Sequence, residues 1–168
     1  YDMQVDDMIV NVPADYTING LPVTTYSNVD EARVRGIESA FDFFITDNWK
    51  LSSSYTYTSA RNKTTGERLK DVPRHFVSAS VNYDNPDWRF GASLFGTYTD
   101  SQFNTQYVLG MTPEKTAPYT SVGLSAWKEL GDGFKIRAAV SNMFNETLVG
   151  SDTINLGRSF SINCEYTF

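Results

Sequence analysis

Residues 157–168 have the sequence GRSFSINCEYTF. Apolar and polar side chains alternate strictly over the last nine positions, and the apolar set is Phe160, Ile162, Cys164, Tyr166 and Phe168. A period of two residues predicts a β-strand with one apolar and one polar face. The sequence stops on an aromatic residue, where soluble proteins usually carry disposable polar residues. The alternation alone fits both a membrane-barrel strand and a strand of a soluble sandwich.

The composition narrows the class of protein. A chain of 168 residues with a formal net charge of -6 lacks the basic footprint of a nucleic-acid binder, so no nucleic-acid partner is expected. No apolar run approaches the length of a membrane-spanning helix. The 11 Phe, 10 Tyr and 3 Trp suit a barrel whose aromatic residues meet both membrane interfaces.

Seven further segments alternate in the same way and are predicted as strands. The first is weak and ends at Pro13, and the second is long, from position 27 to 45. The segments are 8–12, 27–45, 49–58, 77–83, 88–98, 121–126 and 134–144. Three aromatic residues, Phe44, Phe95 and Trp127, fall in the wrong phase of this pattern.

The predicted connections alternate between short and long. Polar turns are expected at 46–48, 84–87 and 130–133, and long loops at 13–26, 61–73, 100–118 and 145–157. Outer-membrane barrels have short periplasmic turns and longer outer loops, and a soluble meander has no reason to sort its connections by side. This sorting predicts an antiparallel up-and-down transmembrane sheet with both chain ends at the periplasmic side.

Four motifs occur in order along the chain. They are NVDEARVRGIES at 28–39, SYTYTSARNKTTGERLKDVPRH at 54–75, VSNMFNETL at 140–148 and the terminal GRSFSINCEYTF. Together they resemble the C-terminal part of a TonB-dependent outer-membrane receptor. Met143 stands where the family usually has Leu.

The resemblance implies an all-β barrel of about 22 strands with a plugged lumen, of which residues 1–168 would be the last eight strands. It implies a bacterial outer-membrane location and uptake of a scarce nutrient, above all a ferric siderophore, with cobalamin and haem as other cargoes. The implied partners are the rest of the barrel, the plug domain, TonB, outer-membrane lipid with its lipopolysaccharide, and the barrel assembly machinery. That machinery would read Phe160, Ile162, Tyr166 and Phe168. The plug, the TonB-binding segment and a signal peptide have no counterpart in these residues.

The predicted polar face carries short side chains, mostly Ser, Thr, Gly, Ala and Asn. The interior of a complete eight-stranded barrel is filled by side chains, so small polar residues fit a wide lumen better. A small complete barrel with a structural or adhesive role remains an alternative, as does a soluble β-domain that binds carbohydrate. The small residues lie at positions 52, 54, 56, 58, 78, 80, 91, 93, 121, 123, 125 and 161.

The sequence contains no catalytic constellation and no transition-metal cluster, since it has one histidine, His75, and one cysteine, Cys164. No enzyme activity, cofactor or metal is predicted. Ligand binding is expected on the outer loops, where guanidinium groups can hold an anionic chelate and aromatic rings can stack on a flat ligand. Alternatively, the arginines form a rim that faces solvent or lipopolysaccharide, and the tyrosines belong to an interface girdle. The candidates are Arg61, Arg68, Arg74, Tyr98, Phe103, Tyr107 and Tyr119.

Overall fold

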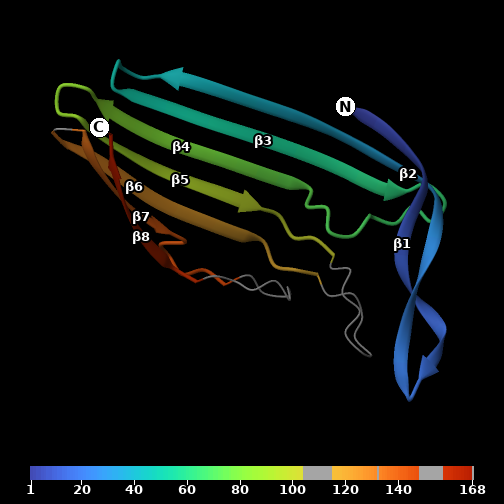
Figure 1. The fold of residues 1–168 in the computed structure, drawn as a ribbon. Helices are drawn as coiled ribbons and strands as arrows, with labels where there is room; N and C mark the ends of the chain where they lie inside the picture. The colour runs from blue at the N-terminus through green and yellow to red at the C-terminus, as the bar shows by residue number, and fades with distance from the viewer. Residues whose placement is uncertain (104–114, 132, 148–156, 168) are drawn as a thin grey trace.

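The protein forms one antiparallel sheet in which each strand pairs with the next along the chain (Figure 1). The computed structural model describes residues 1–103, 115–131, 133–147 and 157–167. No helix long and apolar enough to span a membrane occurs among them. The predicted all-β, up-and-down order of eight strands is confirmed. The strands are β1 Asp2–Ile18, β2 Leu21–Phe44, β3 Trp49–Asn62, β4 His75–Asn85, β5 Phe90–Thr99, β6 Tyr119–Gly131, β7 Phe134–Ser141 and β8 Ser159–Tyr166.

The sheet is curved but open. β1 pairs only with β2 and β8 pairs only with β7, so the first and last strands do not meet (Figure 1). These eight strands therefore do not form a closed barrel of their own. The arrangement is that of a section of wall, which contradicts the alternative of a small complete barrel.

The short and long connections lie at opposite ends of the sheet (Figure 1). Residues 45–48, 86–89 and 132–133 make the short connections at one end, called here the turn end. Residues 63–74, 100–118 and 142–158 make the long connections at the other, called the loop end. The predicted sorting of these six connections is confirmed.

The predicted loop at 13–26 is wrong, because β1 and β2 continue through it as a long hairpin. The turn consists of Asn19 and Gly20 alone, and both have positive φ, 51° and 76°. Asn-Gly is the dipeptide that a two-residue hairpin turn favours, since Gly adopts positive φ without a steric cost. Pro13 does not end β1, because proline is tolerated in an edge strand, and the register shifts between Pro13 and Thr17.

The two chain ends lie at different ends of the sheet. The Tyr1 amino group donates to the Gly36 carbonyl at 2.9 Å, and Asp2 pairs with Arg35, close to the loop end. At the other terminus, the Thr167 N–H donates to the Gly133 carbonyl at 3.0 Å, at the turn end. The prediction that both ends lie on one side is therefore wrong for residue 1.

The predicted seventh strand is also too long, because β7 ends at Ser141 instead of Phe144. Asn142 and Asn145 have positive φ, 48° and 54°, which breaks the extended backbone. The Asn142 side chain closes the turn, since its Nδ2 donates to the Glu146 carbonyl and its Oδ1 accepts the Glu146 N–H, both at 2.9 Å. Asparagine tolerates this conformation and bonds its own backbone, so the turn is local in origin.

One face of the sheet is apolar in continuous rows that cross the strands. Successive register pairs join one residue from each of seven strands, and every member is apolar. This face is called the apolar face. The row is Phe43, Leu51, Val81, Leu94, Leu124, Val140 and Phe160.

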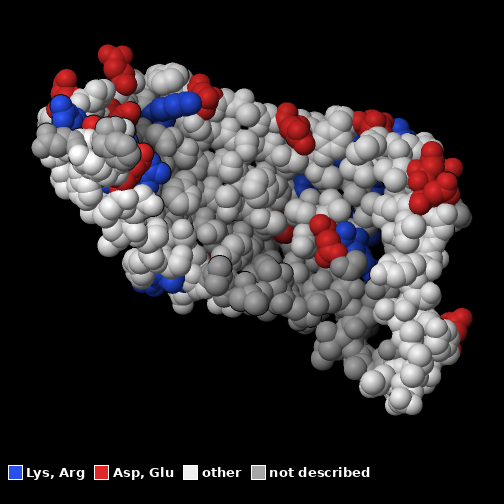
Figure 2. All heavy atoms as spheres, in the orientation of Figure 1, with Lys and Arg blue, Asp and Glu red and all other residues white. Residues whose placement is uncertain are grey.

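The opposite face, called the polar face, carries the short side chains that the sequence predicts. The rows there join Ala40 to Ser54, Ser78, Thr97 and Ser121 across five strands. Ser54 and Ser78 are hydrogen-bonded through their hydroxyl groups at 2.8 Å. On the face seen in Figure 2, charged side chains gather mainly toward the two ends of the sheet, with uncharged surface between them.

Three neighbouring strands have the same aromatic spacing on the apolar face. The stretches 49–57, 75–83 and 90–98 are each nine residues long and begin and end with an aromatic ring. A tilted membrane strand needs about 9–11 residues, and barrels carry aromatic girdles at both interfaces. At the turn end, the ring centroids of Trp49 and Tyr83 are 4.9 Å apart.

The large apolar side chains are not gathered into a core. Among the described residues only Ala32 and Ala60 are buried hydrophobic residues, while Phe43 is 58% exposed and Phe160 76% exposed. Soluble proteins of this size bury such residues, and a contiguous apolar face this large marks a contact with membrane or protein. This contradicts the alternative of a soluble β-domain and is what a lipid-facing wall requires.

Arginine substitutions at two adjacent residues of β6 test the assignment of the two faces. Leu124 lies on the apolar face, opposite the centre of the 90–98 stretch, and Ser125 lies on the polar face. We expect Leu124→Arg to lower the free energy of unfolding by about 2–4 kcal/mol, the cost of arginine at the membrane midplane. Ser125→Arg should change it by less than about 1 kcal/mol, because its guanidinium reaches water. Denaturant unfolding of the full-length protein in lipid bilayers measures both, and equal effects would contradict the assignment of the faces.

Candidate functional site

The backbones of two of the predicted arginines are paired at the loop end. Arg61, near the end of β3, forms an antiparallel bridge with Arg68 in the β3–β4 connection. The Arg61 Nη1 donates to the Gly66 carbonyl at 2.9 Å. Arg74 follows in the same connection, where its carbonyl accepts the Thr58 N–H at 2.9 Å. The structure therefore gathers the three predicted arginines around one loop.

The three guanidinium groups lie in a field of like charge. Partial burial and the neighbouring Arg74 and Arg61 lower the pKa of Arg68, while Asp100 acts in the opposite direction. None of the three forms an ion pair with a carboxylate in the described part of the chain. The cations that do so are Arg33, Arg35, Lys50, Lys63 and Lys135.

Phe103 is the predicted aromatic residue that the structure brings to this cluster. The Arg68 guanidinium carbon lies 5.8 Å from the centre of the Phe103 ring, within the range of a cation–π contact. The Asp71 N–H donates to the Phe103 carbonyl at 2.7 Å, which ties the β5–β6 connection to the β3–β4 connection. Two contacts therefore join these two long connections.

Two of the other predicted aromatic residues, Tyr98 and Tyr119, are not part of this group. Tyr98 pairs with Val77 on the apolar face, whereas Tyr119 pairs with Thr99 on the polar face. Tyr98 and Tyr119 therefore point to opposite sides of the sheet. Tyr107 lies outside the described residues.

An aromatic cluster at the loop end was not among the predicted site residues. The Tyr55 hydroxyl and His75 Nδ1 are hydrogen-bonded at 2.9 Å, and the Tyr57 and His75 ring centroids are 5.3 Å apart. All three lie on the apolar face. His75 is the first residue of β4. The nine-residue spacing from Trp49 to Tyr57 is the sequence signal that could have found the cluster.

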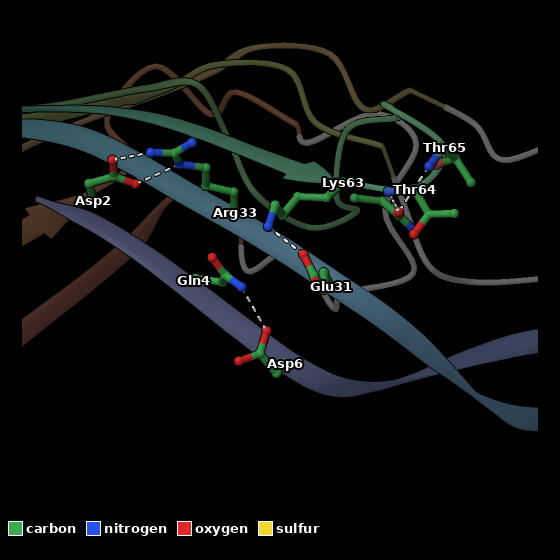
Figure 3. Close-up of polar contacts among 9 residues, drawn as sticks. Asp2, Gln4, Asp6, Glu31, Arg33, Lys63, Thr64 and Thr65 are labelled. Atoms are coloured by element: carbon green, nitrogen blue, oxygen red, sulfur yellow. Dashed lines mark hydrogen bonds and ion pairs between the residues drawn. The ribbon is translucent and has the colours of Figure 1, made fainter.

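Beyond this cluster along β2 and β3, residues in the apolar phase are charged. Figure 3 shows their ion pairs. Arg33 donates to both carboxylate oxygens of Asp2, at 2.6 and 2.9 Å, and Lys63 pairs with Glu31. Arg33 and Glu31 continue the phase of Ile37 along β2. Because these pairs are exposed, they contribute little stability. They mark the height at which the apolar face ends.

The two aromatic residues that break the phase of β5 and β6 each lie over a glycine on the polar face. Phe95 pairs with Gly123, and a Cβ built on Gly123 would lie 2.4 Å from the Phe95 ring. Trp127 pairs with Gly91 in the same way, with Nε1 at 2.3 Å from such a Cβ. An aromatic ring over a cross-strand glycine stabilises a sheet where glycine leaves a gap. The two aromatic residues that interrupt the alternation therefore stabilise the pairing of β5 with β6.

A shallow hollow runs along the polar face of β2 to β5. Its volume is about 530 Å³. Ser52, Ser54, Ser78 and Ser80 contribute to its lining, and Phe95 is also part of its wall. The hollow therefore combines hydroxyl groups with apolar lining such as Phe95.

The terminal strand keeps its predicted alternation. Its apolar side chains are exposed and pair with alternate residues of β7, from Val140 to Phe134, on the apolar face. They are Phe160, Ile162, Cys164 and Tyr166. Their role as an assembly signal stays a prediction. Phe168 lies outside the described residues.

The family model for the "TonB dependent receptor-like, beta-barrel" matches residues 1–143. The chain belongs to this family of TonB-dependent receptor barrels. The ferrienterobactin receptor of Escherichia coli is 24% identical over 135 residues, which are 77% of this chain and 18% of that protein. The iron-regulated outer membrane virulence protein of Vibrio cholerae is 28% identical over 130 residues, which are 76% of this chain and 20% of that protein. The chain therefore spans about a fifth of these relatives.

A solved receptor has the same fold. The ferric enterobactin receptor of Pseudomonas aeruginosa, in a mutant form, superposes with a TM-score of 0.73 and 22% identity, and covers 99% of this chain and 28% of that one. The open sheet of this TonB-dependent receptor chain thus matches part of a larger barrel.

Close approach of Phe95 to Gly123 is testable. A Cβ at position 123 would also lie 2.9 Å from the Val140 carbonyl oxygen, which is backbone and cannot move aside easily. We expect Gly123→Ala to lower the free energy of unfolding by about 1–3 kcal/mol through overpacking. Gly96→Ala is the matched control, because its Cβ would meet nothing closer than 3.3 Å. Thermal unfolding of the full-length protein in detergent compares them, and a harmless Gly123→Ala would refute the close contact.

Proposed function

We propose that this chain is the C-terminal part of the wall of a bacterial outer-membrane receptor that takes up a ferric siderophore. In the complete receptor a plug domain fills the lumen and TonB delivers the energy. The family is one of transport receptors, and no catalytic role is proposed. The observation that carries the proposal is a wall section with one apolar and one polar face in a chain whose relatives include ferrienterobactin and ferric enterobactin receptors.

The orientation follows from the sorted connections. We place the turn end in the periplasm and the loop end outside, as in barrels of this class. The last strand then ends at the periplasmic side, where the barrel assembly machinery reads Phe160, Ile162, Tyr166 and Phe168. The apolar face meets membrane lipid, and the outer leaflet around it contains lipopolysaccharide.

The polar face would look into the lumen. Its serine-lined hollow on β2 to β5 leaves room for the plug domain. Ligand contacts are proposed for residues of the long connections and the polar face, where Tyr119 projects and where the alternation places Arg74. Phe103 and Tyr107 belong in sequence to the long β5–β6 connection.

Uptake of labelled iron tests the proposal. The full-length receptor is expressed in a bacterial strain without siderophore receptors of its own, in the presence and absence of TonB. We expect uptake of ferric enterobactin to require both the receptor and TonB. Cobalamin and haem are offered in parallel as the other cargoes of the family. TonB-dependent uptake of one of them alone would change the cargo, and no TonB-dependent uptake of any would refute the transport function.

A further inference from the structure

The arginines Arg61 and Arg68 lie on the outward side of the sheet. Arg61 pairs with Arg33 across β2 and β3, in the same phase as Tyr57 on the apolar face. The Arg61–Arg68 bridge puts both side chains on that side, and Tyr57 acts electrostatically on Arg68. A guanidinium pair on this side faces the surroundings of the barrel and not its lumen.

The aromatic cluster fixes the height of this pair relative to a membrane. Tyr55, Tyr57 and His75 end the apolar rows at the loop end, and aromatic residues of a barrel sit at the level of the headgroups. Arg61 is four positions beyond Tyr57 along β3, on the same face. The two guanidinium groups therefore stand where headgroup phosphates of the outer leaflet lie.

The charge around the pair is unbalanced. Arg74 also acts on Arg68, although the alternation places its side chain on the polar face. Among the described residues, the carboxylate that acts on Arg68 is that of Asp100, whose Oδ1 already accepts the Ser101 N–H at 2.7 Å and its hydroxyl at 3.3 Å. By contrast, the outward Arg33 is held by Asp2. An anion beside Arg61 and Arg68 would relieve their mutual repulsion, and the planar guanidinium binds phosphate through two parallel hydrogen bonds.

We propose that Arg61 and Arg68 bind the phosphate of an anionic lipid headgroup in the outer leaflet, with Tyr57 and His75 beneath it. This site rests on the proposed outer-membrane location and is independent of the cargo. A soluble anion offers the same phosphate chemistry, but the aromatic platform under the cations favours a lipid, whose sugar and acyl parts have a surface to lie on.

The test measures lipid binding to the full-length receptor in detergent. The probes are bisphosphorylated lipid A, dephosphorylated lipid A and inorganic phosphate, each titrated while bound lipid is counted by native mass spectrometry. We expect the wild type to prefer the phosphorylated lipid. The R61Q/R68Q variant should bind it at least about tenfold more weakly, because two charge-assisted contacts are lost. R33Q is the matched control and should bind like the wild type, because it removes an outward guanidinium that Asp2 already occupies.

Three results would overturn the proposal. The first is equal lipid affinity of R61Q/R68Q and the wild type. The second is competition by inorganic phosphate at the concentration of the lipid itself, which would mark a free-anion site. The third is loss of cargo binding in R61Q/R68Q with lipid binding intact.

If R61Q/R68Q does not fold, R61K/R68K keeps the charge without the planar fork and should bind with intermediate affinity. Cargo uptake by the wild type is scored separately, so its failure would refute the transport proposal alone.

Discussion

Hydrogen bonding between neighbouring strands is the constraint on which the rest of this structure depends. From β2 to β7 every strand has a partner on both sides over much of its length, so most backbone polar groups there are satisfied within the sheet. Only then can a whole face of the sheet consist of apolar side chains in contact with hydrocarbon, because lipid offers no hydrogen bonds. The outer edges of β1 and β8 have no partner strand among the described residues. Such edges call for further strands, as in a larger barrel.

Once the backbone groups are hydrogen-bonded between strands, the side chains on the two faces of the sheet can differ in polarity and size. The apolar face carries its large side chains in the open and ends at aromatic rings at both heights, so it stabilises the protein by contact with lipid and not by a buried core. The polar face is built from small hydroxyl-bearing residues, which leave a hollow along β2 to β5. Phe95 and Trp127 are placed there to cover glycines, which keeps a face of small residues well packed.

Much of this fold is predictable from the sequence, because the two-residue alternation of apolar and polar side chains in a strand can be recognised within a short stretch of residues. The alternation in β3 to β8 gives the strands, their faces and the sorted ends. The β1–β2 hairpin was missed because an Asn-Gly turn between irregular, polar strands has no such alternation, and pairing decides it instead. The gathering of Arg61 and Arg68 was predictable as a loop cluster, but its side was not. That side depends on the register of β2 against β3, which no short stretch of sequence encodes.

The most direct test of the two-faced wall is an accessibility scan of β6. Spin labels are placed one at a time at residues 120–128 of the full-length protein in lipid bilayers, with Cys164→Ala to remove the one cysteine of residues 1–168. Collisions with oxygen report lipid, and collisions with a water-soluble nickel complex report water. We expect the two to alternate with a period of two, with oxygen highest at Val122, Leu124 and Ala126. Equal exposure of both sets to the nickel complex would contradict the account, since neither face would then meet lipid.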